Sequence, residues 1–171
     1  MVVQGFHNLY RSRWVCGIVT IPDGRVVAHR MLFNSGPTDW SAVLRTTCYG
    51  PVQPRTILAR LAKDKFGVLP KIENIKHVIT HSDAKYEYTD PEPRPAWDYH
   101  YDSHYMAKIE VLVYKISYPE MVKFYIKHHD IDIVVMPFKK ILSDISSGAW
   151  LEYNVTVFNL LNEMCKKEFA A

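Results

Sequence analysis

The chain lacks the features that would place it outside the ordinary globular class. It has no run of about 18 apolar residues, the length that a membrane-spanning helix needs. Its three cysteines are odd in number and widely spaced, so neither a disulfide framework nor a zinc ribbon is indicated. The first residues, MVVQGFHNLYRSRW, hold no continuous apolar segment of the kind that secretory signals carry. We therefore expect an intracellular protein of a reducing compartment, with no membrane contact.

The composition is that of a folded domain with a mild excess of positive charge. The 171 residues are 48% apolar and 23% charged, which predicts a single domain over residues 1–171 with a sizeable core. The net charge of +3 is compatible with a nucleotide or RNA partner. It is lower than that of dedicated nucleic-acid modules.

The stretch from Gly50 to Val68 organises the rest of the chain. It predicts a Gly-Pro turn, an amphipathic helix and a glycine at the helix end. Apolar residues recur at helical spacing and form one buried stripe: Ile57, Leu58, Leu61, Ala62 and Phe66. The remaining positions carry charge: Arg55, Arg60, Lys63, Asp64 and Lys65.

Strands are predicted before and after this helix. Residues Trp14 to Ile21 and Arg25 to Leu32 are apolar runs joined by a Pro-Asp-Gly turn, which favours a hairpin. Residues Ile72 to His81 alternate apolar and polar side chains, as a half-buried strand does. His77 and His81 are an even number apart and should share a strand face, as two metal ligands without a third or as ordinary surface histidines.

The second half of the chain predicts two more strands and up to three helices. Strands are expected at Met106 to Ile116 and Ile131 to Met136, and a helix after Pro137 that stops near Gly148. Residues Pro119 to His129 fit a short helix or an extension of the preceding strand. Asn154 is expected to cap a last helix from Val155 to Phe169.

Residues Ser82 to Tyr105 form the most unusual segment, rich in proline and aromatic side chains. Three prolines between Pro91 and Pro95 exclude a helix, and we expect a long loop. Its rings would stack on a nucleobase, cover the protein's own core, or meet a protein partner, and the sequence leaves all three open. The aromatic residues are Tyr86, Tyr88, Trp97, Tyr99, Tyr101 and Tyr105.

The turn, the helix and the Gly67-Val68 pair resemble the signature region of the Nudix superfamily. The order of elements matches that family over nearly the whole chain, including a basic pair, His29-Arg30, at the end of the second strand. The resemblance implies an α/β protein with a Nudix-like α/β/α sandwich around a mixed sheet. It also implies a divalent metal, magnesium or manganese, held by clustered glutamates for diphosphate hydrolysis.

The residues that carry this chemistry in the family are mostly replaced here. The family's signature arginine falls on Arg60 and its first helix glutamate on Leu61. The glutamate pair falls on Asp64-Lys65, so one shortened carboxylate remains and a cation stands beside it. The family's Gly-Gly turn is reduced to a segment from Thr46 to Gly50, in which only Gly50 remains. Such a helix should repel magnesium and attract phosphate directly.

Three functions remain open. The first is binding of a nucleotide or RNA without hydrolysis and without a cofactor, although the same charges fit an ordinary solvated helix face. The second is a divergent hydrolase that uses magnesium or manganese, Asp64 and a carboxylate of the loop (Glu87, Asp90, Glu92, Asp98 or Asp102). The third is a structural subunit whose protein partner meets the tyrosine-rich loop. The predicted nucleotide or RNA contacts are Arg30, Arg55, Arg60, Lys63, Lys65, Tyr86, Tyr88, Trp97, Tyr99 and Tyr101.

Overall fold

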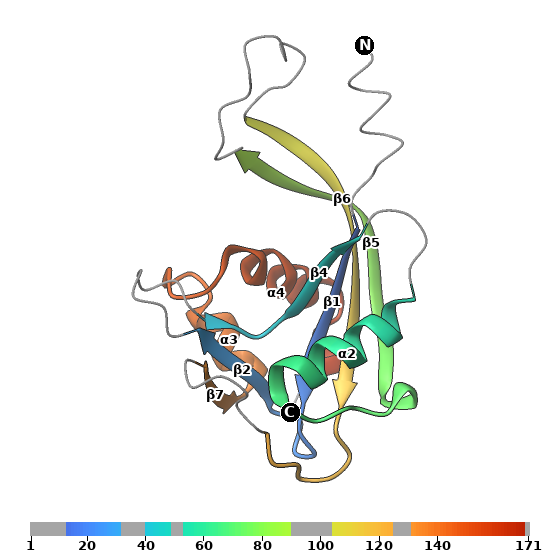
Figure 1. Cartoon of the computed structure of the whole chain (residues 1–171). Helices are drawn as coiled ribbons and strands as arrows, with labels where there is room; N and C mark the ends of the chain where they lie inside the picture. The colour runs from blue at the N-terminus through green and yellow to red at the C-terminus, as the bar shows by residue number, and fades with distance from the viewer. Residues whose placement is uncertain (1–12, 32–39, 49–52, 90–103, 125–130, 170–171) are drawn as a thin grey trace.

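The fold consists of a mixed β-sheet between two layers of helix. A computed structural model describes residues 13–31, 40–48, 53–89, 104–124 and 131–169 (Figure 1). Its strands are β1 (Arg13–Thr20), β2 (Val26–Met31), β3 (Trp40–Ser41), β4 (Leu44–Cys48), β5 (Ile75–Thr89), β6 (His104–Ser117) and β7 (Ile131–Met136). Its helices are α2 (Pro54–Phe66), α3 (Phe138–Asp144) and α4 (Glu152–Met164), with short 3-10 turns at Ile72–Asn74 and Lys166–Phe169. Within these residues, none of the helices is long and apolar enough to cross a membrane.

The sheet divides into two branches along β1. Strand β1 runs parallel to β6 over its whole length, whereas its other pairings are antiparallel. On the side away from β6, its first residues pair with β4 and its end meets β2 only at Thr20 and Val26. Strand β2 then continues as the centre of a second branch with β3 and β7. This mixed sheet confirms the predicted sheet type.

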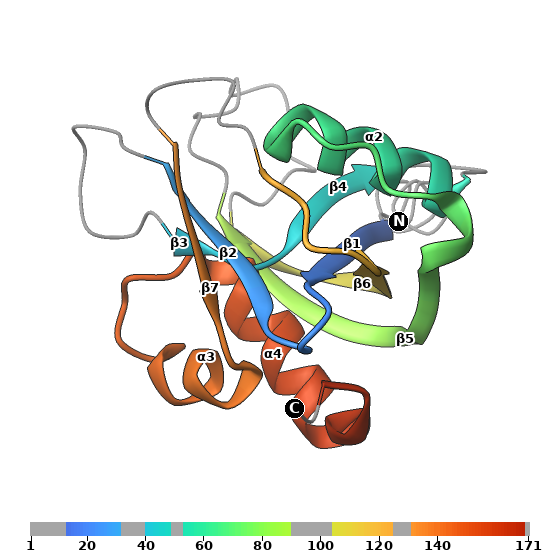
Figure 2. The same cartoon turned by 90° about the horizontal axis from the view of Figure 1, so that it is seen from below.

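Alternation along β1 separates two hydrophobic layers. Trp14, Cys16 and Ile18 pack against α3 and α4, while Val15 and Val19 pack against α2. Figure 2 shows the two layers on opposite sides of the sheet, with α2 on one and α3 and α4 on the other. The predicted α/β/α sandwich is therefore confirmed. The single domain over residues 1–171 stays a prediction.

Helix α2 forms where the sequence predicts it. Pro54 stands in its first turn, and Gly67 ends it with a φ of 79°, which places its N–H 2.8 Å from the carbonyl oxygen of Lys63. Leu58 and Phe66 are fully buried. At Gly17 of β1, an added Cβ would lie 2.7 Å from Cδ1 of Ile116 and 3.0 Å from Cδ2 of Leu58, so the ends of these two buried side chains would have to shift.

Four sequence predictions are wrong in part. The expected loop from Ser82 to Tyr105 is strand as far as Thr89 and again from His104, and residues 90–103 lie outside the described part of the chain. Backbone pairing with β6 overrides the weak strand signal there. The expected turn from Thr46 to Gly50 is strand as far as Cys48, because these residues pair with the start of β1.

The expected helix from Pro119 to His129 is not present in residues 119–124, and residues 125–130 lie outside the described part. Tyr118 explains the absence of this helix. Its backbone N–H donates a hydrogen bond to the carbonyl oxygen of Thr20, and its hydroxyl donates one to the carbonyl oxygen of Val68 at 2.9 Å. Phe124 packs against the rings of both Tyr118 and Phe66, which holds this segment against α2 in a non-helical path.

Asn154 is not the cap of the last helix. Helix α4 begins at Glu152 and ends at Met164, so Asn154 lies in its first turn. Its side chain is fully buried and accepts a 2.8 Å hydrogen bond from the backbone N–H of Ala42. It also donates to Ser41 and to the carbonyl of Leu151. Asn154 therefore fastens α4 to the segment between β3 and β4, a long-range role that sequence spacing does not indicate.

Candidate functional site

The surface of α2 is the candidate site, because it carries the signature positions. Leu61, at the position of the first glutamate, is half-buried and packs against the α2 layer. Asp64 is exposed, as are Arg60 and Lys63. Lys65 is half-buried. The helix therefore presents one carboxylate and several cations around its solvent side.

Arg55 is drawn away from the other cations of α2. Its Nε donates a 2.8 Å hydrogen bond to the carbonyl oxygen of Ile75, and its guanidinium carbon lies 5.3 Å from the ring centroid of Tyr114. His77 packs its ring on the same tyrosine, with centroids 5.3 Å apart. Arg55 thus belongs to the junction of α2 with β5 and β6, while its terminal nitrogens remain on an exposed side chain.

His29 is buried beside the helix rather than exposed in a basic pair. Only 5% of it is accessible, and its ring meets Phe66 edge-on with centroids 5.8 Å apart. Burial, and secondarily the charge of Lys65, lowers the pKa of His29 to about 4. His29 is therefore neutral at physiological pH. The pair His29-Arg30 at the end of β2 is therefore not an exposed pair of charges.

Arg30 lies on the opposite face of the sheet from α2. Neighbours on a strand alternate between faces, so Arg30 points towards the α4 layer, with its guanidinium carbon 5.8 Å from the Trp40 ring centroid. The structure does not bring Arg30 together with Arg60, Lys63 or Lys65.

The tyrosine-rich segment is described only in part. Tyr86 and Tyr88 lie in β5, with backbones opposite Ala107 and Tyr105 of β6. This end of the β5–β6 hairpin extends well beyond the helices (Figure 1). The remaining predicted contacts lie outside the described residues: Trp97, Tyr99 and Tyr101.

Solved structures share this fold over almost the entire chain. The Escherichia coli ORF135 protein superposes with a TM-score of 0.56 at 12% identity, covering 94% of this chain and 95% of its own. The MutT protein of Methanosarcina mazei Go1 gives 0.54 at 13% identity, covering 92% and 96%. RenU, a Nudix hydrolase of M. smegmatis, gives 0.50 at 9% identity, covering 92% and 86%. The chain has the Nudix fold. No protein-family model matches the sequence, and no curated protein resembles it closely enough to count as a relative.

The Nudix fold implies a divalent metal on α2, and the residues present do not fit one. Magnesium and manganese need several oxygen ligands in an octahedral arrangement. Of the three signature positions, only Asp64 carries a carboxylate, and Lys65 places an ammonium group beside it. Among the described residues there is no group of three His, Cys, Asp or Glu side chains placed to hold a metal ion.

His77 and His81 do not form a ligand pair. The register of β5 against β6 shifts between His77 and Ile79, which marks a β-bulge at Val78. His77 therefore lies opposite Tyr114, and His81 lies opposite Val111. These partners belong to the α2 and α4 layers respectively, so the two histidines point to opposite faces. The prediction of a shared face is wrong, because the bulge adds one residue between them.

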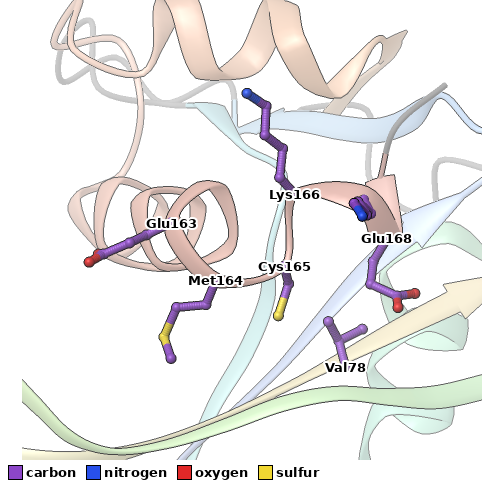
Figure 3. A pocket seen from close by; sticks show the side chains of 7 residues that line it. Val78, Glu163, Met164, Cys165, Lys166 and Glu168 are labelled. Atoms are coloured by element: carbon purple, nitrogen blue, oxygen red, sulfur yellow. The ribbon is translucent and has the colours of Figure 1, made fainter.

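A shallow pocket of about 390 Å³ lies where the end of α4 and the 3-10 turn Lys166–Phe169 meet β5 (Figure 3). It contains none of the residues that the sequence predicts for the site. Its lining residues are Val78, Glu163, Met164, Cys165, Lys166, Lys167 and Glu168.

The three cysteines of the chain, Cys16, Cys48 and Cys165, are all unpaired thiols.

Sequence reasoning missed Arg45, which β4 places on the α4 side of the sheet opposite Cys16. Its guanidinium carbon lies 4.9 Å from the Trp14 ring centroid and 4.5 Å from that of Tyr153. The two rings belong to β1 and α4, and the residues that carry them are 139 positions apart in the sequence. No local pattern could have indicated this arrangement.

Proposed function

We propose that this Nudix-fold protein binds the phosphate groups of a nucleotide or RNA without hydrolysing them. One observation carries the proposal: the signature positions that would hold metal ligands are occupied by Leu61, packed against the α2 layer, and by Lys65, beside a buried histidine. Restoring a metal site would require a carboxylate at both positions.

The charge of α2 supports phosphate binding. Arg60 and Lys63 are both exposed, and the only acidic residue of the helix is Asp64. A phosphate group is attracted to such a surface over a distance of about 10 Å at moderate ionic strength. Lys65 adds a third cation to this side of the sheet. Arg55 contributes at the start of the helix, and Arg30 would contact only ligand that reaches the α4 side.

Binding is tested with a matched pair of charge variants. The test variant is Arg60→Gln with Lys63→Gln. The control is Lys139→Gln with Lys140→Gln, which removes two exposed charges from α3 in the other helix layer. Fluorescence anisotropy of a labelled single-stranded RNA and of a labelled nucleotide is followed between about 50 and 200 mM salt.

We expect the α2 variant to bind more weakly and with a shallower salt dependence, by about one unit of slope for each phosphate that the variant no longer neutralises. The control should bind as the parent does. An equal decrease in affinity in both variants would mean a non-specific charge effect and would reject the α2 surface as the site.

Hydrolysis is tested separately with a panel of nucleoside diphosphate derivatives and magnesium or manganese. We expect no metal-dependent release of phosphate or nucleotide. Release that disappears in Asp64→Asn would instead establish a divergent hydrolase and would overturn the proposal that turnover is lost.

A further inference from the structure

Arg45 packs its guanidinium against two aromatic rings, those of Trp14 and Tyr153. Trp14 of β1 is almost fully buried, and Tyr153 of α4 is itself fixed by a hydrogen bond between its hydroxyl and that of Ser41 at 3.1 Å. The guanidinium carbon lies 4.9 Å from one ring centroid and 4.5 Å from the other, within the range of cation–π attraction. A long cationic side chain ordered in this way loses little further freedom when a ligand binds.

The charge of Arg45 is not neutralised by the described part of the protein. Its Nε is buried and has no hydrogen-bond partner. Its Nη1 donates to the hydroxyl of Thr47, at 3.1 Å. None of the carboxylates in the described ranges forms an ion pair with it. The Cys16 thiol opposite it stays protonated, because burial raises its pKa to about 12.

This arrangement is costly for stability and suited to an anion. A buried donor without a partner destabilises a folded protein, and such groups persist where function requires them. The buried Nε cannot meet a ligand, so a ligand would approach the terminal edge formed by Nη1 and Nη2. At this edge the bond from Nη1 to Thr47 is exposed to solvent. Two N–H donors on a planar edge match the oxygens of a phosphate group.

We propose that Arg45, packed against Trp14 and Tyr153 with the Thr47 hydroxyl beside it, is a phosphate-binding residue on the α4 side of the sheet. The site is separate from the α2 surface, because Arg45 lies opposite Cys16 in the layer that faces α4. It does not depend on the function proposed for α2. A nucleotide or a nucleic-acid backbone could supply the phosphate, and the same chemistry applies to both.

The test measures binding of inorganic pyrophosphate by calorimetry, and of a short single-stranded RNA by anisotropy, together with the melting temperature of each variant. Arg45→Met keeps a long flexible side chain between the rings and removes the charge. We expect it to bind pyrophosphate at least about ten-fold more weakly, while its melting temperature stays level or rises because the unpartnered Nε is gone. Arg45→Lys keeps a charge without the planar edge and should retain part of the affinity.

Arg25→Met is the matched control. Arg25 stands directly before β2, is exposed and is already paired with Asp23 at 2.8 Å. Its replacement should leave pyrophosphate affinity unchanged. If Arg45→Met weakens pyrophosphate binding but not RNA binding, the site is specific for small phosphates. If it weakens the binding of both ligands, the site accepts phosphate groups in general.

Two outcomes overturn the proposal: no pyrophosphate binding by the parent protein, and unchanged pyrophosphate affinity in Arg45→Met. If affinity is unchanged and the melting temperature is lower in both Arg45 variants, Arg45 is instead a structural link between β1 and α4. Because the α2 variants leave Arg45 intact, failure here and failure of the α2 site give different results.

Discussion

Protonation of His29 is expected to make the protein less stable in mild acid. The pKa of His29 falls from an ordinary 6.5 to about 4 on folding, first because the ring is buried and second because Lys65 is nearby. Between these two values the unfolded chain binds a proton that the folded protein does not. Stability is therefore complete above about pH 6.5 and is lost as the pH falls towards 4.

The size of the effect follows from the two pKa values. At pH 5 the unfolded state gains about 2 kcal/mol relative to neutral pH from this one residue, since each pH unit in the window is worth about 1.4 kcal/mol. The free energy of unfolding is measured by urea denaturation from about pH 7.5 to pH 5, for the parent and for His29→Gln. The difference between the two curves isolates His29 from other groups that titrate in both proteins.

The control is His77→Gln, which replaces an exposed histidine on the same side of the sheet. Its curve should follow that of the parent. If His29→Gln loses stability between pH 7.5 and 5 as steeply as the parent does, the buried imidazole is not the group that takes up the proton.

Three further predictions concern the core. Gly17→Ala should destabilise the protein by about 1–3 kcal/mol in urea unfolding, because the new Cβ meets Ile116 at 2.7 Å, and an unchanged midpoint would contradict the close approach. Asn154→Ala should cost about 2 kcal/mol by leaving the buried N–H of Ala42 without an acceptor, and a thermal melt equal to the parent's would reject that role. Cys16 should resist iodoacetamide near pH 8 in the folded protein and react only after denaturation, since its thiol is fully buried with a pKa of about 12. Modified Cys16 found by peptide mass spectrometry under native conditions would disprove this.

The function proposed for α2 and the phosphate contact proposed at Arg45 make different demands on the fold. The function proposed for α2 depends on which side chains the helix carries, and these are visible in the sequence. The Arg45 contact depends on two rings brought together by the sheet and the last helix. The two are distinguishable because Arg45 and α2 lie on opposite faces of the sheet at β1.

Local sequence signals predicted the elements whose cause is local. Helix α2 has its apolar stripe, its proline at the start and its glycine at the end all within one short segment, and it forms as expected. The strands β1, β2 and β7 match their predictions to within about a residue, a normal margin for element ends. The order of these elements was sufficient to indicate the Nudix fold despite identities of 9–13% to the solved structures described above.

Other predictions failed where long-range contacts decide. The helix expected after Pro119 is absent from residues 119–124, because Tyr118 and Phe124 are held against the α2 layer. The strand β5 continues past Ser82 because β6 offers a partner over its whole length. Pairing and packing between distant segments contribute more free energy than the local preferences that the sequence displays.

Neighbouring residues alone were enough to predict helix α2, strands β1, β2 and β7, the order of the elements and the charge of α2. The side of the sheet that each charge occupies followed only from the folded arrangement. The bulge at Val78 places His77 and His81 on opposite faces of the sheet, and strand alternation does the same for His29 and Arg30. The packing of α4 near β1 brings the rings of Trp14 and Tyr153 to Arg45. These outcomes depend on strand register and on contacts between residues far apart in the chain, and no local pattern encodes either.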